Sequence, residues 1–217
     1  MNDILIIGGG GHALVLASLL KKHKDWNPIG YTDPEDHGPL LTLPYLGTDQ
    51  VVPSLLSSRD LKHAAIGIGL VGSTEHRARV IKSVIALGFS LPAIYSPNAI
   101  VNEDVKVGDG SVIMDGAVIQ PGVRIGVFSI INTGTNVDHE CIIGDHVHLA
   151  PGVTLSGQVE LGNHILIGVG ARILQGITVT DHVIVGGGAM VISNLETSGT
   201  YVGIPARIIL KKNIKGC

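Results

Sequence analysis

The sequence predicts an α/β domain of the Rossmann type over residues 1–95, followed by a parallel β-helix over residues 96–217. Two patterns indicate this division: strand-like and helix-like segments alternate in the first part, whereas aliphatic residues recur at every sixth position in the second. The composition agrees with a slim interior. Because the 217 residues include 30 Gly but only two Phe, four Tyr and one Trp, the core must be filled by aliphatic side chains.

A period of six residues organises the C-terminal part. Ile, Leu or Val stands at sixteen consecutive positions, six apart and without an insertion: Val101, Val107, Ile113, Ile119, Ile125, Ile131, Val137, Ile143, Leu149, Leu155, Leu161, Ile167, Ile173, Val179, Val185 and Val191. This period fits short strands joined by tight turns, with 18 residues in each three-sided coil and the aliphatic residues stacked inside. Glycines 18 residues apart would fill one column of turns, where a positive φ or a close crossing favours glycine: Gly108, Gly126, Gly144 and Gly162.

The N-terminal part alternates between strands and helices, which predicts a small parallel sheet. We expect strands at 4–7, 28–31, 64–70 and 91–95, and helices at 13–22 and 74–87.

A glycine-rich turn follows the first predicted strand. Gly8, Gly10 and Ala13 satisfy the pattern G-x-G-x-x-G/A, and Asp33 lies 20 residues beyond Ala13. Such a turn brings phosphate close to bare backbone at a helix N-terminus, with the acid on a ribose hydroxyl. Because the domain is only half of a dinucleotide fold, a mononucleotide, as in a nucleotide-activated sugar, fits better than NAD. The alternative for this turn is that it only packs the helix on the strand. His12 is placed to bind a phosphate, and a solvated histidine at the helix start is the alternative for it.

Polar residues that the repeat does not require gather at 132–141. A neutral imidazole accepts a proton from an attacking amine or hydroxyl, and a neighbouring carboxylate orients it and raises its basicity. We therefore predict that His139 is a general base, with Asp138 or Glu140 as the orienting acid; an ordinary turn histidine is the alternative. Cys141 falls on an inward position of the repeat, so we expect it to pack in the core.

Three further histidines, His146, His164 and His182, lie 18 residues apart and would line one edge of the β-helix. Ligands in a line lack the convergent tetrahedral geometry of zinc, so we predict exposed turn positions and no metal site. His148 lies off this line and within one coil of His139.

Other classes of protein are disfavoured. The formal net charge is −3 with scattered Lys and Arg, which argues against nucleic-acid binding. No run of 18 apolar residues is present, and the N-terminus lacks the basic region of a signal peptide. We expect a cytoplasmic protein that binds neither nucleic acid nor membrane.

Several motifs together resemble the sugar O- and N-acetyltransferase family of hexapeptide-repeat acyltransferases, which includes sialic acid O-acetyltransferases. They are GGGGH at 8–12, Asp33, NTGTNVDHECIIGDHVH at 132–148, GVGARI at 168–173, VGGGAMV at 185–191 and VGIPAR at 202–207. The chain looks most like the N-acetyltransferases of UDP-, GDP- or dTDP-linked 4-amino-4,6-dideoxy sugars. Relatives that use UDP often show two acids after the second strand, where this chain has Asp33 followed by Pro34.

The resemblance implies a left-handed β-helix, a homotrimer, and direct acetyl transfer from acetyl-CoA to a nucleotide-linked amino sugar without a metal, in the biosynthesis of bacterial surface glycans such as lipopolysaccharide. It implies that His139 is the base and that Glu140 supports it. The residues implied to hold the nucleotide sugar are Gly10, Gly11, His12, Asp33, Gly67, Gly69 and Asn132. Those implied to line the acetyl-CoA groove between neighbouring β-helices are His148, Gly157, Val169 and Gly187.

Two other functions compete with this one. The first is O-acetylation of sialic acid or another free sugar, which would not need the phosphate-binding turn. The second is a non-catalytic or zinc-binding β-helix of the carbonic-anhydrase type, which would leave the N-terminal domain without a role.

Overall fold

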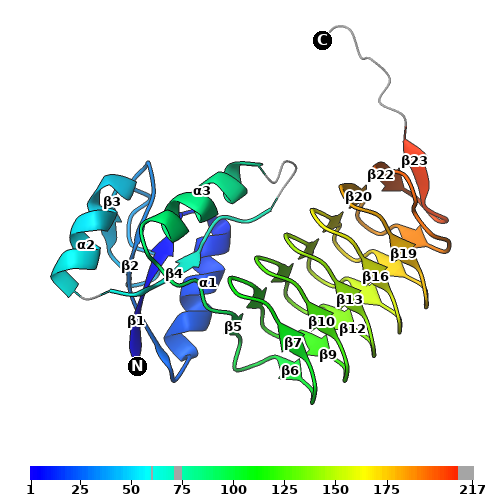
Figure 1. Cartoon of the computed structure of the whole chain (residues 1–217), viewed down its shortest axis with the longest axis horizontal. Coiled ribbons are helices and arrows are strands. Elements are labelled where there is room, and N and C mark those ends of the chain that lie inside the picture. The colour runs from blue at the N-terminus through cyan, green and yellow to red at the C-terminus, as the bar shows by residue number, and fades with distance from the viewer. Residues whose placement is uncertain (60, 71–74, 210–217) are drawn as a thin grey trace, which may run out of the picture. The chain divides into compact units, whose positions relative to one another are not determined.

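The structure is a computed structural model that describes residues 1–59, 61–70 and 75–209, and the chain divides into two compact units, Met1–Pro97 and Asn98–Cys217 (Figure 1). None of the helices within the described ranges has the length and apolar character that crossing a membrane requires.

The first unit is built on a four-stranded parallel sheet with the strand order β3-β2-β1-β4. Its strands are β1 (Asn2–Ile7), β2 (Trp26–Thr32), β3 (Tyr45–Gly47) and β4 (His63–Ile66). Its helices are α1 (Gly11–Lys22), α2 (Val52–Arg59), which follows the 3-10 turn η1 (Asp49–Val51), and α3 (Glu75–Ala86). β1 lies between two neighbours, and its residues Ile4 to Ile7 are at most 2% exposed, which explains their continuous apolar run.

Some predicted boundaries in this unit are wrong. The strand predicted at 64–70 already ends at Ile66. Gly67 follows it, and a Cβ there would lie 2.7 Å from the Cβ of Ala13, so the close approach to α1 requires glycine. The strand predicted at 91–95 is reduced to β5 (Ile94–Tyr95), outside the four-stranded sheet. β3, η1 and α2 were not predicted, because elements of three to eight residues carry little periodic signal. Thr74, which begins the second predicted helix, lies outside the described residues.

The second unit is a left-handed parallel β-helix (Figure 1). Each coil contains three short strands, one in each of three sheets. Sheet 1 contains β7 (Lys106–Val107), β10 (Arg124–Ile125), β13 (Ile142–Ile143), β16 (Glu160–Leu161) and β19 (Thr178–Val179). Sheet 2 contains β6 (Ile100–Val101), β9 (Val118–Ile119), β12 (Asn136–Val137), β15 (Thr154–Leu155), β18 (Arg172–Ile173) and β21 (Met190–Val191). The strands of sheet 3 in this unit are β8 (Val112–Ile113), β11 (Ile130–Ile131), β14 (His148–Leu149), β17 (Leu166–Ile167), β20 (Val183–Val185), β22 (Gly199–Val202) and the antiparallel β23 (Arg207–Ile209).

The register of these strands explains the period of six. Paired residues are 18 apart, as in Ile125 with Ile143 and Ile131 with Leu149, so equivalent side chains of successive coils stack inside. The innermost positions are fully buried: Ile113, Ile119, Ile131, Leu149, Leu155, Ile167, Val185 and Val191. Each coil is therefore one turn of three hexads, and the repeated inward positions from 101 to 191 are all aliphatic; the one buried Phe, Tyr or Trp ring among the described residues of this unit is Tyr201, which pairs with Val185 beyond the last regular hexad.

Three columns of turns join the sheets, and each column holds residues with a positive φ. The glycine edge, between sheets 3 and 2, has glycine at every such position: Gly116, Gly134, Gly152, Gly170 and Gly188. The His139 edge, between sheets 2 and 1, has Asp104, Gly122, Glu140, Gln158 and Gly176. The histidine-stack edge, between sheets 1 and 3, has Gly110, Phe128, His146, His164 and His182.

The predicted column of Gly108, Gly126, Gly144 and Gly162 needs glycine for close approach and not for a positive φ. A Cβ on Gly108 would lie 2.7 Å from the carbonyl carbon of Gly126, and one on Gly144 would lie 2.7 Å from that of Gly162. None of these four glycines has a positive φ.

The rings of the histidine-stack edge pack face to face. Their centroids are 5.2 Å apart for Phe128 and His146, 4.8 Å for His146 and His164, and 5.0 Å for His164 and His182, with interplanar angles of 30°, 7° and 2°. The prediction of exposed turn histidines is wrong for two of them: His146 and His164 are half-buried, and only His182 is exposed.

Candidate active site

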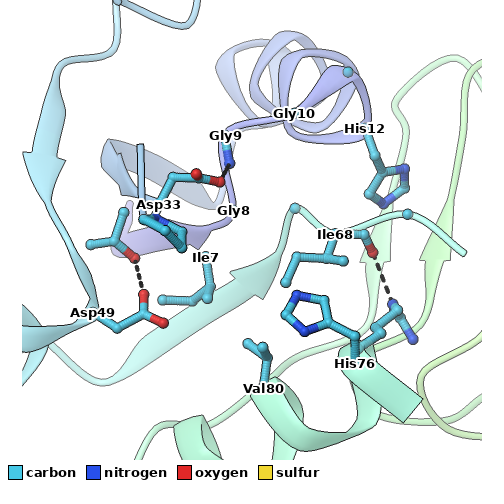
Figure 2. A pocket seen from close by; sticks show the side chains of 16 residues that line it. Ile7, Gly8, Gly9, Gly10, His12, Asp33, Asp49, Ile68, His76 and Val80 are labelled. Carbon is cyan, nitrogen blue, oxygen red and sulfur yellow. Dashed lines mark hydrogen bonds between the residues drawn. The ribbon is translucent and has the colours of Figure 1, made fainter. Parts of the chain in front are cut away.

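A cavity of about 550 Å³ lies at the carboxyl ends of β1, β2 and β4 in the first unit (Figure 2). In an open parallel sheet, ligands bind where the strand order changes direction, which is here between β1 and β4. The cavity is lined by Ile7, Gly8, Gly9, Gly10, Gly11, His12, Thr32, Asp33, Pro34, Asp49, Gly67, Ile68, Gly69, His76, Arg77 and Val80. It therefore brings together every residue of the first unit that was predicted to hold the nucleotide sugar.

The N-terminus of α1 opens onto this cavity. Gly10 is its N-cap, no side chain caps the helix, and its first turn carries no acidic residue. A Cβ on Gly10 or Gly11 would meet nothing within 4 Å, so the space in front of these residues is open. The free N–H groups and the helix dipole favour an anion here.

Asp33 holds the glycine-rich turn in place. Its Oδ2 accepts a hydrogen bond from the Gly9 N–H at 2.7 Å, and its Oδ1 accepts from the Glu35 N–H at 3.0 Å and lies 3.2 Å from His37 Nε2. Partial burial opposes ionisation, but these hydrogen bonds outweigh it and hold the pKa of Asp33 below its usual value. The carboxylate thus shapes the phosphate-binding turn in addition to lining the cavity.

Sequence reasoning missed two charged residues of the cavity. Asp49 follows β3 and accepts a hydrogen bond from the Thr32 hydroxyl at 3.0 Å, which Figure 2 shows beside Ile7. Arg77, in the first turn of α3, is 2% exposed and donates from Nε to the Ile68 carbonyl at 3.0 Å. Burial lowers the pKa of Arg77 to about 10, so it keeps its charge at neutral pH. Asp49 follows an unpredicted strand, and Arg77 lies in a polar helix start, so neither had a distinctive signal.

His139 lies in the second unit, on the turn between β12 and β13. Its Nδ1 is 3.2 Å from Glu140 Oε2, whereas Asp138 Oδ1 accepts a hydrogen bond from the His139 backbone N–H at 2.8 Å. Of the two candidate acids, Glu140 therefore contacts the ring and Asp138 caps the turn. A carboxylate can only accept, so this contact favours a hydrogen on Nδ1 and leaves Nε2 unprotonated. The His139 side chain is 48% exposed, so the imidazole lies at the surface of the turn.

Gly157 lies directly against the His139 ring. A Cβ there would be 2.5 Å from Nε2, 2.6 Å from Cε1 and 3.0 Å from Cδ2. Gly157 has no positive φ, so the imidazole, and not the backbone conformation, requires glycine at this position.

Asn132 and His148 contact one another. Asn132 Nδ2 is 3.1 Å from His148 Nε2, and Asn132 Oδ1 accepts from the Thr133 N–H at 2.8 Å. His148 is only 8% exposed. The two residues, which were predicted to bind different ligands, thus form one polar pair.

The predicted residues of the second unit do not form one cluster within a chain. His139, Glu140 and Gly157 lie on the His139 edge, whereas Asn132, Val169 and Gly187 lie on the glycine edge. These two edges flank sheet 2 on opposite sides, and His148 belongs to β14 of sheet 3. The chain therefore presents two partial sites.

Comparisons with known proteins agree with this architecture. Residues 3–84 match the PglD N-terminal domain family, and no curated protein sequence matches the chain significantly. One similar solved structure is that of GDP-perosamine N-acetyl transferase from Caulobacter crescentus, determined as a histidine-to-alanine variant in complex with CoA and GDP-perosamine. It is 33% identical to this chain, with a TM-score of 0.89, and the match covers 96% of this chain and 97% of that chain. This chain belongs to the hexapeptide-repeat sugar acetyltransferases.

Two further solved members of this family are similar over their full length. The acetyltransferase domain of PglB from Neisseria gonorrhoeae, in complex with acetyl coenzyme A, is 32% identical over 96% of this chain and 100% of that chain, with a TM-score of 0.84. WeeI from Acinetobacter baumannii is 25% identical over 96% and 100%, with a TM-score of 0.83.

In this acetyltransferase, Cys141 is a core residue. It is fully buried, and its Sγ donates to the Ser156 carbonyl at 3.2 Å. Burial raises the pKa of the thiol, which keeps it protonated and unsuited to nucleophilic attack. Among the described residues, no group of three or more His, Cys, Asp or Glu side chains is arranged to hold a metal ion.

Proposed function

We propose that this protein transfers the acetyl group of acetyl-CoA to the 4-amino group of a nucleotide-linked amino-dideoxy sugar, with His139 as the general base. The observation that carries this proposal is the His139 imidazole, whose Nδ1 contacts Glu140 at 3.2 Å, which favours Nε2 as the proton acceptor. The C. crescentus relative was solved with CoA and GDP-perosamine bound, and in it a histidine had been replaced by alanine.

The cavity of the first unit would hold the nucleotide. Its diphosphate would lie at the N-terminus of α1, against the open backbone of Gly10 and Gly11, where N–H groups and the helix dipole favour negative charge. His12 and Arg77 in the cavity wall add donors and one permanent positive charge. Gly67 and Gly69, which follow β4, would leave room for the rest of the nucleotide sugar.

The transfer step follows from the proposed base. The sugar amine attacks the thioester carbonyl, so that a C–N bond forms, and His139 Nε2 takes the proton that the amine loses. A backbone N–H would stabilise the oxyanion. The tetrahedral intermediate then expels CoA as its C–S bond breaks, and the imidazolium returns the proton to the leaving thiolate. Glu140 stabilises the imidazolium between these steps.

We further propose that the working enzyme is a homotrimer with acetyl-CoA bound between neighbouring β-helices. The support is the division of the candidate residues between two edges of one chain. A complete site would combine His139 and Gly157 of one copy with Asn132, His148, Val169 and Gly187 of the next. Val169 is 60% exposed on the glycine edge, as a residue that contacts a ligand or a neighbouring copy would be. A cytoplasmic location is part of the proposal, because acetyl-CoA and nucleotide sugars are made there.

A panel of acceptors tests this function. Purified protein is incubated with acetyl-CoA and UDP-, GDP- or dTDP-linked 4-amino sugars, or with free sialic acid, and CoA thiol release is followed for each. We expect release with at least one nucleotide-linked amino sugar and none with sialic acid. Turnover of sialic acid alone would instead show a sugar O-acetyltransferase, and would overturn the proposal.

A further inference from the structure

Gln158 lies one coil beyond Glu140 on the His139 edge, and the structure places its amide against the carboxylate. Its Nε2 donates to Glu140 Oε2 at 3.1 Å, and its backbone N–H donates to the His139 carbonyl at 2.9 Å. The residue is thus joined to both members of the proposed base pair, although it is far from them in sequence.

A single carboxylate oxygen accepts from both side chains. Glu140 Oε2 lies 3.2 Å from His139 Nδ1 and 3.1 Å from Gln158 Nε2. The Glu140 side chain is 62% exposed, so water competes for this oxygen and the side chain is free to turn away from the ring. A second donor on the same oxygen restrains the carboxylate where it faces the imidazole.

The backbone places the two side chains one above the other. Glu140 and Gln158 have φ values of 58° and 60°, and Asp104 on the same edge also has a left-handed φ, whereas Gly122 and Gly176 occupy the flanking coils. A left-handed conformation is unfavourable for glutamate and glutamine. On the histidine-stack edge, residues with the same conformation carry stacked rings. On the His139 edge, Glu140 and Gln158 are instead joined by a hydrogen bond between their side chains.

We propose that Gln158 is a positioning residue that acts through Glu140 on His139, in a relay of amide, carboxylate and imidazole. The amide fixes the carboxylate, the carboxylate holds the hydrogen on Nδ1, and Nε2 remains the acceptor for the amine proton. The effect on rate rests on the function proposed above, but the relay is a property of the side chains themselves.

Two variants of matched length test the relay. Gln158→Met removes the donor, whereas Gln158→Lys replaces it with another donor, and both keep a side chain on the same left-handed residue. For Gln158→Met we expect kcat to fall about three- to ten-fold, the range for one lost hydrogen bond, with unchanged KM for both substrates and an unchanged melting temperature. For Gln158→Lys we expect kcat within about two-fold of the parent, since an ammonium donates well to a carboxylate. Equal losses in both variants, or none in Gln158→Met, would overturn the proposal.

A spectroscopic measurement reads the relay without turnover. Ring ¹⁵N shifts of labelled histidine distinguish the two neutral tautomers at alkaline pH, and the His139→Asn variant identifies the signal. We expect the Nδ1–H form in the parent and in Gln158→Lys, and a shift toward Nε2–H in Gln158→Met. If the tautomer does not change, the relay is absent even when transfer is observed. If the tautomer changes but no amino sugar is acetylated, the proposed function fails and the relay stands.

Discussion

The His139 edge and the histidine-stack edge are built from the same left-handed turn, but they use it differently. On the histidine-stack edge, Phe128 and the three histidines carry rings that face one another at 4.8–5.2 Å between centroids. Each of these side chains therefore packs on the ring of a neighbouring coil. On the His139 edge the left-handed residues carry no rings; one of them is Glu140, and the imidazole of His139 beside it extends over the bare backbone of Gly157. The rings of the histidine-stack edge pack on one another, whereas the His139 ring, which belongs to the residue before Glu140, contacts a carboxylate, as the proposed base requires.

Removal of His139 tests most directly whether the two edges differ in function. For His139→Ala we expect kcat to fall about 10²- to 10⁴-fold, as for loss of a general base, with an unchanged melting temperature because the side chain is exposed. Transfer is measured by CoA release, and stability by thermal unfolding. His182→Ala is the matched control, because His182 is also exposed on the β-helix but belongs to the stack. Equal losses of activity in both variants would contradict the distinction.

Gly157 and Gly176 lie on the same edge but require glycine for different reasons, so their alanine variants separate placement of the His139 ring from backbone strain. For Gly157→Ala the new Cβ would meet the His139 ring and displace it, so we expect kcat to fall about 10- to 100-fold with little loss of stability. Gly176, on the same edge, has a φ of 69° and open space around its Cβ position. For Gly176→Ala we expect the reverse: full activity and about 1–2 kcal/mol lower free energy of unfolding. Denaturant titration and initial rates of the two variants measure both effects.

His164 is the residue that tests how much the histidine-stack edge contributes to stability, because its ring stacks on rings in both neighbouring coils. Two ring contacts are lost in His164→Ala, so we expect the free energy of unfolding to fall by about 1–3 kcal/mol with kcat unchanged. Chemical denaturation of the parent and the variant measures this difference. A fall in kcat without a fall in stability would show that the stack contributes to the chemistry.

The smallest expected effect concerns Asp181, which begins the turn before His182. Its Oδ1 accepts a hydrogen bond from the Asn163 N–H at 2.7 Å. This hydrogen bond lowers the pKa of Asp181; slight desolvation opposes it, whereas Asn163 Nδ2, His182 and His164 lower the pKa further. A group whose pKa is lowered on folding adds stability above its unfolded pKa and loses it as pH falls through the folded value. In Asp181→Asn the amide oxygen still accepts, as that of Asn163 does from the Asp145 N–H in the preceding coil. We therefore expect the parent to lose slightly more stability than the variant below about pH 4, measured as the shift of urea midpoints between pH 7 and pH 3.

Much of this site follows from the periodicity. His139 and Glu140 stand out because the repeat does not require polar residues there, and Gln158 is 18 residues beyond Glu140, so the coil length already relates the two. Which acid orients the histidine did not follow from the sequence, because Asp138 and Glu140 both flank His139. The turn geometry directs Asp138 to the His139 backbone N–H and Glu140 to the ring. The cavity residues Asp49 and Arg77 were not found, because they lie in short or polar segments without periodic signal.

The interior of the β-helix follows from the sequence alone: the period of six sets the coil length and assigns the inward aliphatic residues, because each coil repeats the same local arrangement. The sequence also indicated the glycine-rich turn, because that motif is contiguous. Which side chains contact one another depends on the tertiary structure. Asp33 reaches the turn at Gly9, Gly157 lies under the imidazole, and His139 and Asn132 are on opposite sides of sheet 2. Such contacts join segments through the geometry of the sheet and the coil, which no single stretch of sequence contains.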